Sequence, residues 1–183
     1  MNTSREIKVA VSGHRQLTNL PYLENDILAA ADRIQTAFSN HQYHVWSCLA
    51  EGADRILSRI LVKRLEAKLT IVLPLPELEY IKDFKTDKSI QEFRDLKQMA
   101  DNIIVPDQIF ARPLAYQVAN HTLLQDCDLL VTIWDGMPAR GPGGTSEVVE
   151  SIRQAEKPLL WIHTVQEKNI NVLTEERFPN LNA

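Results

Sequence analysis

Three short segments of the chain place glycine beside side chains that can bind a phosphate group or a sugar. Residues 12–15 read Ser-Gly-His-Arg, residues 51–55 read Glu-Gly-Ala-Asp-Arg, and residues 141–147 read Gly-Pro-Gly-Gly-Thr-Ser-Glu. Glycine lets the backbone approach an anion closely, and the first N–H groups of a helix lack partners within the helix and can donate to an anion. The three segments are therefore candidates for a site that binds a phosphorylated ligand.

The third segment has the residues that suit phosphate best. Gly143 and Gly144 allow close backbone approach, while Thr145 and Ser146 bring hydroxyl and N–H groups to the start of a predicted helix. The alternative is a loop that only turns the chain and caps that helix. Glu147, near the third helical position, suits a cap partner stabilised by the helix dipole as well as it suits a ligand contact.

The first two segments suit different parts of a ligand. Arg15 is the better of two candidate donors after the first predicted strand, because its guanidinium matches phosphate geometry; His14 is the other. In the second segment, Glu51 and Asp54 would repel phosphate, so a carboxylate there suits ribose hydroxyl groups. The alternatives are plain surface residues at 14 and 15 and, for the two acids, stabilisation by the dipole of the following helix.

Six apolar runs of strand length alternate with segments of helical period. Several runs are nearly continuous in Val, Ile and Leu, which is typical of parallel strands covered on both faces. The sequence therefore predicts a doubly wound α/β fold: a mostly parallel, Rossmann-like sheet with helices on both faces and a ligand site at the carboxyl edge of the strands. All six glycines follow predicted strands. The predicted strands are Ile7–Ser12, Tyr43–Leu49, Leu69–Leu73, Asn102–Val105, Leu129–Trp134 and Pro158–His163.

The composition is that of an ordinary globular protein. The chain has 183 residues, 44% of them hydrophobic and 24% charged, with a formal net charge of −4. An acidic chain is not expected to present an extended nucleic-acid surface, and no apolar stretch is long enough to cross a membrane. The five histidines and two cysteines lack metal-ligand spacing. We expect one cytoplasmic domain over residues 1–183, without a metal site and with no cofactor beyond a nucleotide-type ligand.

Two regions depart from the alternation of strands and helices. Residues 75–101 form a charged insertion that is predicted to hold one helix near 89–100. Its first part, 76–88, fits a solvated surface excursion better than a mobile flap over the site. The tail, residues 164–183, loses periodicity, and we expect it either to be partly disordered or to pack in a dimer. Related folds often pair through helices, so a homodimer or larger homo-oligomer is expected.

Taken together and in this order, the three segments resemble those of the SLOG superfamily, over about residues 7–163. That group contains the Lonely Guy phosphoribohydrolases and many bacterial proteins proposed to sense nucleotide derivatives. The resemblance implies a Rossmann-like fold in which the loop 143–145 holds phosphate and the turns at Gly13 and Gly52 line the nucleoside part of the pocket. The chain has neither the Gly-Lys-Ser/Thr of a Walker loop nor, after its first strand, the Gly-x-Gly-x-x-Gly of dinucleotide-binding proteins.

The chain departs from the hydrolase branch of that superfamily at two places. The branch resembles Pro-Gly-Gly-x-Gly-Thr-x-x-Glu, with its catalytic Glu three places after Thr. Here that place is Val148, the acid is Glu147, and the glycine loop is one residue shorter. The branch also carries an Arg on the helix before the strand that leads into the loop, whereas residues 117–124 contain none and Arg112 lies a turn or two earlier. These departures favour binding over hydrolysis.

Three functions are compatible with the sequence. We favour a module that binds or senses a nucleotide or nucleotide-derived ligand. The alternatives are hydrolysis of a nucleotide N-glycosidic bond, with Glu147 or Asp54 acting on an activated water, and a non-catalytic structural or assembly partner. Tyr116 and Asn120, one helical turn apart, are candidates to stack on and hydrogen-bond to a base or ribose, or they only pack on a helix face. The candidate ligand-binding residues are Gly13, His14, Arg15, Gly52, Ala53, Asp54, Tyr116, Asn120, Asp135, Gly136, Gly143, Gly144, Thr145, Ser146 and Glu147.

Overall fold

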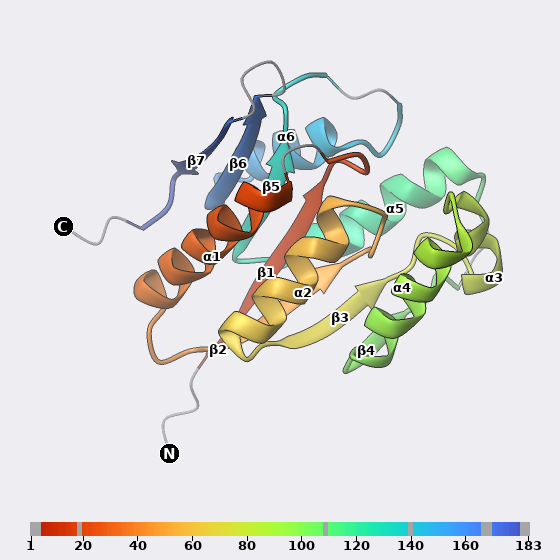
Figure 1. Cartoon of the computed structure of the whole chain (residues 1–183), viewed down its shortest axis with the longest axis horizontal. Helices are drawn as coiled ribbons and strands as arrows, with labels where there is room; N and C mark the ends of the chain where they lie inside the picture. The colour runs from red at the N-terminus through yellow and green to blue at the C-terminus, as the bar shows by residue number, and fades with distance from the viewer. Residues whose placement is uncertain (1–4, 18–19, 108–109, 139–140, 166–169, 180–183) are drawn as a thin grey trace.

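The structure, a computed structural model, describes residues 5–17, 20–107, 110–138, 141–165 and 170–179 (Figure 1). The described residues form one seven-stranded sheet with the strand order β4-β3-β2-β1-β5-β6-β7. Strands β1 to β6 are parallel, and β7 is antiparallel to β6. The predicted doubly wound, mostly parallel α/β fold is confirmed. The strands are β1 (Glu6–Gly13), β2 (Gln42–Ser47), β3 (Lys68–Val72), β4 (Asn102–Ile104), β5 (Leu129–Trp134), β6 (Leu159–Val165) and β7 (Ile170–Glu176).

Helices cover both faces of the sheet (Figure 1). The buried clusters place α1, α2 and α4 on one face and α6, with most of α5, on the other. In α2, for example, Leu57, Leu61 and Leu65 recur at helical spacing and are buried against the sheet. The helical segments are α1 (Leu20–Ala37), α2 (Ala53–Leu65), α3 (Glu77–Tyr80), the 3-10 helix η1 (Ile81–Asp83), α4 (Asp87–Gln98), α5 (Arg112–Leu124) and α6 (Thr145–Gln154).

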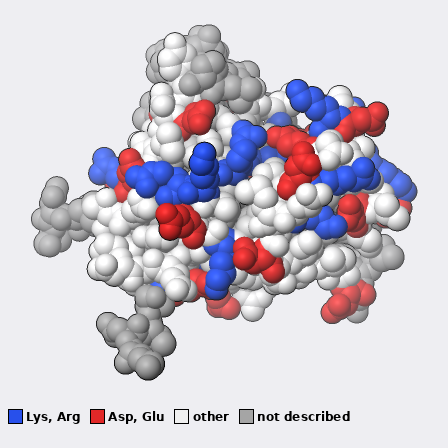
Figure 2. Space-filling view, turned by 60° about the horizontal axis from the view of Figure 1, so that its bottom comes forward, with Lys and Arg blue, Asp and Glu red and all other residues white. Residues whose placement is uncertain are grey.

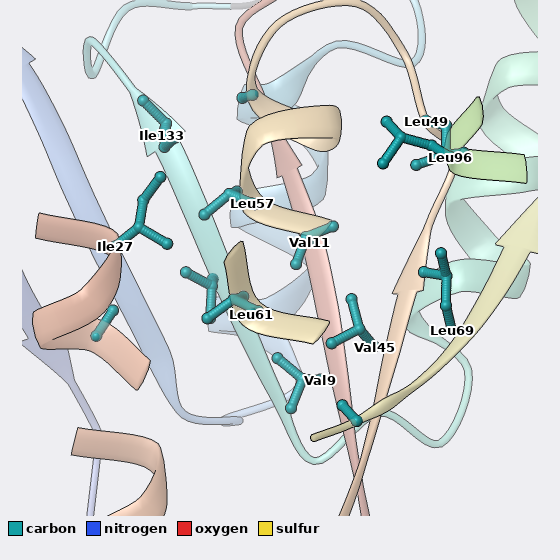
Figure 3. Close-up of a cluster of buried hydrophobic side chains, with 14 of the residues drawn as sticks. Val9, Val11, Ile27, Val45, Leu49, Leu57, Leu61, Leu69, Leu96 and Ile133 are labelled. Atoms are coloured by element: carbon teal, nitrogen blue, oxygen red, sulfur yellow. The ribbon is translucent and has the colours of Figure 1, made fainter. Parts of the chain in front are cut away.

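The central strands are buried on both faces because their sequences are almost entirely apolar. Every residue of β5 is buried. Val9 and Val11 of β1 pack in one cluster with Ile133 of β5 (Figure 3). Leu57 and Leu61 of α2 complete that cluster. Burial of each such side chain contributes about 1.5–3 kcal/mol, so this layer holds the strand ends rigidly in place.

The strand order reverses direction between β1 and β5. From β1 the chain moves outward through β2, β3 and β4, and then returns to place β5 on the other side of β1. Gly13 at the end of β1 pairs with Ile133 near the end of β5. The loops that follow two such strands turn to opposite sides and leave a crevice, which is the usual ligand site of open α/β sheets.

The insertion at 75–101 is part of the hydrophobic core. It contains α3 and η1 as well as the single expected helix, which is α4. The rings of Tyr80 and Phe84 lie 5.0 Å apart, those of Phe84 and Phe93 lie 5.3 Å apart, and all three side chains are buried. The prediction that residues 76–88 form a solvated surface excursion is therefore wrong, because aromatic residues within them are buried.

The tail forms an additional strand within its own chain. Residues 170–176 are β7, which pairs with β6 along its whole length. The carboxylate of Glu176 accepts hydrogen bonds from Arg153 of α6 at 2.6 and 2.8 Å, and Phe178 is buried in the main core. The loss of periodicity after residue 163 thus reflects an antiparallel edge strand, and the expected self-association stays a prediction.

Basic and acidic side chains are interspersed on the face of the molecule that Figure 2 shows. Within the described ranges, no helix has both the length and the apolar character needed to span a membrane. The same residues contain no group of three or more His, Cys, Asp and Glu side chains placed to hold a metal ion. Both cysteines, Cys48 and Cys127, are buried free thiols, as expected for core residues.

Candidate functional site

A cavity of about 680 Å³ lies at the carboxyl edge of the sheet. Its walls come from the turns after β1 and β2, the loop after β5, the start of α6, the middle of α5 and the insertion. Pockets that bind small molecules commonly have volumes of roughly 300–1,000 Å³. The predicted site residues that line this cavity are Gly13, His14, Arg15, Asp54, Tyr116, Asn120, Asp135, Gly143, Gly144, Thr145 and Ser146.

The remaining predicted residues lie beside the cavity without lining it. Gly52 and Ala53 pack against the turn after β1, where the N–H of Ala53 donates to the carbonyl oxygen of His14 at 2.9 Å. Gly136 lies against the aromatic side chains of β6. Glu147 lines a separate hollow of about 320 Å³ between α5 and α6. The structure thus brings together most of the three segments, but not every residue within them.

Two glycines allow the first two turns to touch. A Cβ atom on Gly13 would lie 2.4 Å from the carbonyl oxygen of Ile133 and 2.5 Å from the Cβ of Ala53. Gly52 has a φ of 85°, and a Cβ there would lie 2.4 Å from the carbonyl oxygen of Arg15. Only glycine fits both positions, because backbone or core atoms occupy the space of a side chain. This contact fixes the start of α2 directly beside Arg15.

Asp54 places a buried carboxyl group in the cavity wall. Its exposed fraction is 5%, and its Oδ2 accepts a hydrogen bond from the N–H of Ala50 at 3.2 Å. Burial raises the pKa of Asp54 to about 7, against the opposing effects of the Ala50 hydrogen bond and the positive charge of Arg15. Such a group is partly protonated near neutral pH, so it can either accept a hydrogen bond from a ligand hydroxyl or donate one.

The start of α6 forms another wall of the cavity. Gly144 is the N-cap residue, and no side chain caps the first turn. The backbone of Gly143, the preceding residue, is held by two side chains: Asn120 donates to its carbonyl oxygen at 2.9 Å, and Glu147 accepts from its N–H at 3.0 Å. Thr145 and Ser146 line the cavity. The first turn of α6 therefore faces the cavity while its one acidic residue turns away.

Arg15 and Tyr116 form a pair at the cavity wall. The Arg15 guanidinium carbon lies 5.3 Å from the centroid of the Tyr116 ring, in the geometry of a cation–π contact. The Tyr116 hydroxyl donates to Asp83 of the insertion, and burial raises the pKa of Tyr116 to about 12. The Tyr116 ring, which was expected to stack on a base, therefore contacts Arg15. The amide of Asn120 donates to the carbonyl oxygen of Gly143 in the glycine loop.

His14 and Asp135 interact across the crevice between β1 and β5. The Nε2 atom of His14 lies 2.8 Å from Oδ1 of Asp135 and also accepts a hydrogen bond from the Asp135 N–H at 3.1 Å. Oδ1 in turn accepts from the N–H of Met137 at 2.9 Å. Both side chains line the cavity, so this pair fixes the two loops relative to each other at the edge of the site.

Comparisons with known proteins bear on the fold. No protein-family model matches the chain, and no curated protein matches it in sequence. Among solved structures, DNA processing protein A (DprA) from Streptococcus pneumoniae superposes with a TM-score of 0.58 at 13% identity, over 89% of this chain and 52% of DprA. The chain therefore has a Rossmann-like α/β fold similar to that of DprA. It spans about half the length of DprA.

Two structures of the molybdenum cofactor carrier protein from Chlamydomonas reinhardtii are also similar to this chain. Each superposes with a TM-score of 0.45, at 19% and 20% identity. The superpositions cover 90% of this chain and 80% and 81% of the carrier chains.

Sequence reasoning missed the residues that the insertion adds to this site. Tyr80, Asp83 and Lys85 all line the cavity. The available signal was the four-residue spacing of Tyr80 and Phe84 in an otherwise charged segment, which is typical of a buried helical face. Arg112 forms an ion pair with the insertion, because its Nη1 atom lies 2.8 Å from Oδ1 of Asp83.

Proposed function

We propose that the protein binds a nucleotide or a nucleotide-derived ligand in the cavity at the carboxyl edge of its sheet. One observation carries the proposal: the uncapped first turn of α6, the guanidinium of Arg15 and the buried carboxyl of Asp54 all line this cavity. Phosphate suits the first two groups, and a sugar hydroxyl suits the third. The cavity therefore offers both kinds of contact that a ribose phosphate requires.

The phosphate end is formed by α6 and Arg15. Thr145 and Ser146 supply N–H and hydroxyl donors at the positive end of the helix dipole. An anion at such a position is stabilised by about 0.3–1 kcal/mol when exposed and up to about 2 kcal/mol when partly buried. Arg15 adds a planar, permanently charged group whose paired donors match two phosphate oxygens. A phosphate gains from both features at once.

The remainder of the cavity is rich in hydrogen-bond acceptors. Asp54, Asp83 and Asp135 present carboxyl oxygens, and Tyr80 and Trp134 add aromatic surface. Ribose hydroxyls and the exocyclic amino groups of bases are donors, so they complement these oxygens. The aromatic surface suits the apolar body of a sugar or base. This distribution supports a ligand that is anionic at one end and rich in donors at the other.

A ligand panel tests the proposal. Nucleoside mono- and diphosphates, cyclic nucleotides and NAD are added to the protein, and thermal unfolding is followed. A true ligand at 100 times its Kd adds about 2.7 kcal/mol of stability and raises the Tm measurably. DprA, which has a similar fold, is a DNA processing protein. A short single-stranded oligonucleotide is therefore included as a competitor. If no nucleotide raises the Tm, the chain is better explained as an assembly partner.

Matched arginine variants locate the binding. Arg15→Ala is expected to weaken phosphate-dependent binding about tenfold or more, because it removes a charge-assisted contact. Arg94→Ala removes the same charge from an exposed position on α4 that does not line the cavity, and it should leave binding unchanged. Equal effects of the two variants would mean that only the net charge matters.

A second function, hydrolysis of a nucleotide N-glycosidic bond, is favoured by the buried carboxyl of Asp54. With its pKa raised to about 7 by burial, Asp54 has the affinity for a proton that a general base needs near neutral pH. In that reaction Asp54 takes a proton from water, the water oxygen bonds to C1′ of the ribose, and the bond from C1′ to the base nitrogen breaks. The base leaves with the electron pair of that bond and takes up a proton.

The same geometry argues against Glu147 in that role. Its carboxylate accepts from the N–H of Gly143 and lines the other hollow. Chromatography after incubation with nucleoside monophosphates and NAD tests the reaction. Release of free base that is abolished by Asp54→Asn and retained in Glu147→Gln supports hydrolysis by Asp54, whereas binding without release supports a sensor.

A further inference from the structure

Tyr116 touches three separate walls of the cavity. Its ring lies beneath the guanidinium of Arg15, at 5.3 Å from ring centroid to guanidinium carbon. Its Cβ atom packs against the glycine loop so closely that a Cβ on Gly143 would be 2.7 Å away. Its hydroxyl donates to Asp83 of the insertion. No other feature of α5 links the turn after β1, the start of α6 and the insertion among the residues that the structure describes.

The insertion holds the hydroxyl end of Tyr116 through Asp83. Asp83 interacts with Arg112 as well as with Tyr116, through distances of 2.8 and 2.9 Å from Nη1 of Arg112 to its two carboxylate oxygens. Arg112 also donates to the carbonyl oxygen of Glu79 at 3.2 Å. The edge of the Tyr80 ring packs against Tyr116, with centroids 6.2 Å apart. The ring of Tyr116 is therefore fixed from below before any ligand binds.

Arg15, by contrast, is exposed, and a long exposed side chain loses rotamer entropy when it grips a ligand. A fixed aromatic face under the guanidinium reduces that cost, because the planar group is already oriented. Since Tyr116 also abuts Gly143, the oriented guanidinium lies on the same side of the cavity as the phosphate-binding end of α6.

From these contacts we propose that Tyr116 is a positioning residue, which orients Arg15 toward the phosphate of the ligand and is itself held by Asp83 of the insertion. The proposal rests on the proposed function, since it assigns a role in phosphate recognition to a residue that need not touch the ligand. It gives the insertion a part in phosphate recognition, because Asp83 holds the ring on which Arg15 lies.

The test uses ribose 5-phosphate and ribose as probes, because any ribonucleotide shares their structure whatever its base. Their affinities are measured by calorimetric titration of the full chain. Tyr116→Leu should reduce the preference for ribose 5-phosphate over ribose about tenfold. Tyr116→Phe, which keeps the ring but loses the hydrogen bond to Asp83, should reduce it less, by about threefold. Tyr22→Leu, the same change at an exposed position on α1 with 64% exposure, is the control. Ribose affinity should be similar in all four proteins.

A double-mutant cycle decides whether Tyr116 acts through Arg15. Arg15→Ala should reduce the preference for phosphate about tenfold or more, and adding Tyr116→Leu to it should have no further effect, because both changes remove the same oriented group. Additive losses would overturn the proposal and leave the proposed function standing. A wild-type protein that binds neither ribose 5-phosphate nor any nucleotide would overturn both.

Arg15→Lys provides a version of the test that does not disturb core packing. Lysine keeps the charge but cannot lie flat on an aromatic ring with paired donors directed at phosphate. The proposal expects most of the phosphate preference to be lost in this variant. If Arg15→Lys binds ribose 5-phosphate as tightly as the wild type, orientation by Tyr116 is not needed and the proposal fails.

Discussion

Two helices, α2 and α6, follow strands through glycine, and both have an acidic residue in the first turn, yet their first turns have different surroundings. At α2, the N–H of Ala53 donates to the carbonyl oxygen of His14, and the carboxyl of Asp54 turns into the cavity wall. No side chain caps the first turn of either helix, but at α6 Glu147 turns outward to the N–H of Gly143, and Thr145 and Ser146 line the cavity. The start of α2 therefore serves the fold and presents an acid, whereas the start of α6 is suited to an anion.

The difference teaches that a strand–glycine–helix pattern locates a helix start without showing whether its N–H groups are available. At α2 the glycine is required by contact with the turn after β1. At α6, Asn120 and Glu147 hold the backbone of Gly143, and Thr145 and Ser146 of the first turn line the cavity. Substitutions at the two helix starts should accordingly have different consequences, for stability at α2 and for binding at α6.

The largest expected effect is on stability at Gly52. Gly52→Ala should lower the free energy of unfolding by about 3 kcal/mol or more, or prevent folding, because its φ of 85° is strained for alanine and the new Cβ meets backbone oxygens at 2.4 and 2.5 Å. Gly141→Ala is the matched control, since a Cβ there meets no atom within 4 Å. Chemical denaturation measures both. A mild Gly52→Ala phenotype would mean that the two turns are not in close contact.

The next effect is the pH dependence that Asp54 gives to stability. Burial raises its pKa from an ordinary 3.8 to about 7 in the folded state. Between these values the folded state holds a proton that the unfolded state has released, so stability falls as pH rises from about 4 to about 7 and then levels off. The full contribution is on the order of 4 kcal/mol, at about 1.4 kcal/mol for each pKa unit.

Asp54→Asn isolates this contribution, because asparagine resembles the protonated acid. The unfolding free energy of the variant relative to wild type should increase by a few kcal/mol between about pH 4 and pH 8. Denaturant titrations at pH 4.5, 6 and 8 measure it. A difference that stays constant with pH would show that the carboxyl is ionised at all three pH values. Asp54 would then not be suited to act as a general base near neutral pH.

The sequence predicted the sheet well because strands buried on both faces must be apolar on both faces. The continuous runs of β1 and β5 are of this kind, and they place the three glycine segments at one edge. The sequence signal was weaker where burial is one-sided. In the insertion, Tyr80 and Phe84 are buried among charged neighbours. In β7 only Ile-Asn-Val alternates, which is too short to distinguish an edge strand from an irregular tail.

Within the site, residue type predicted which positions line the cavity better than it predicted their partners. Tyr116 lines the cavity as expected, but its ring contacts Arg15, which is distant in sequence. Glu147 is at the expected position in the helix, but its carboxylate lies on the far side of the loop from Thr145 and Ser146. Such pairings depend on the direction of each side chain across elements, which local spacing does not specify.

A smaller effect is expected at Thr145 on the α6 side of the comparison. Thr145→Val keeps the shape and the backbone N–H but removes one hydroxyl donor, so the Kd for a phosphorylated ligand should rise about three- to tenfold. Thr36→Val, at an exposed position on α1, removes a hydroxyl outside the cavity and should leave the Kd unchanged. Titration with the best nucleotide of the panel measures both. An unchanged Kd in Thr145→Val would leave phosphate binding to the backbone and Arg15 alone.

The smallest effect is expected at Glu147. Glutamine keeps an oxygen that can accept from the N–H of Gly143 but removes a negative charge from the first turn of α6. Glu147→Gln should therefore lower stability by about 0.3–1 kcal/mol through the helix dipole and leave phosphate affinity the same or raise it up to about threefold. Glu150→Gln, on the same helix beyond its first turn, is the control for charge. A tenfold loss of binding in Glu147→Gln alone would show that Glu147 contacts the ligand. Both helix starts would then present an acidic residue to the cavity.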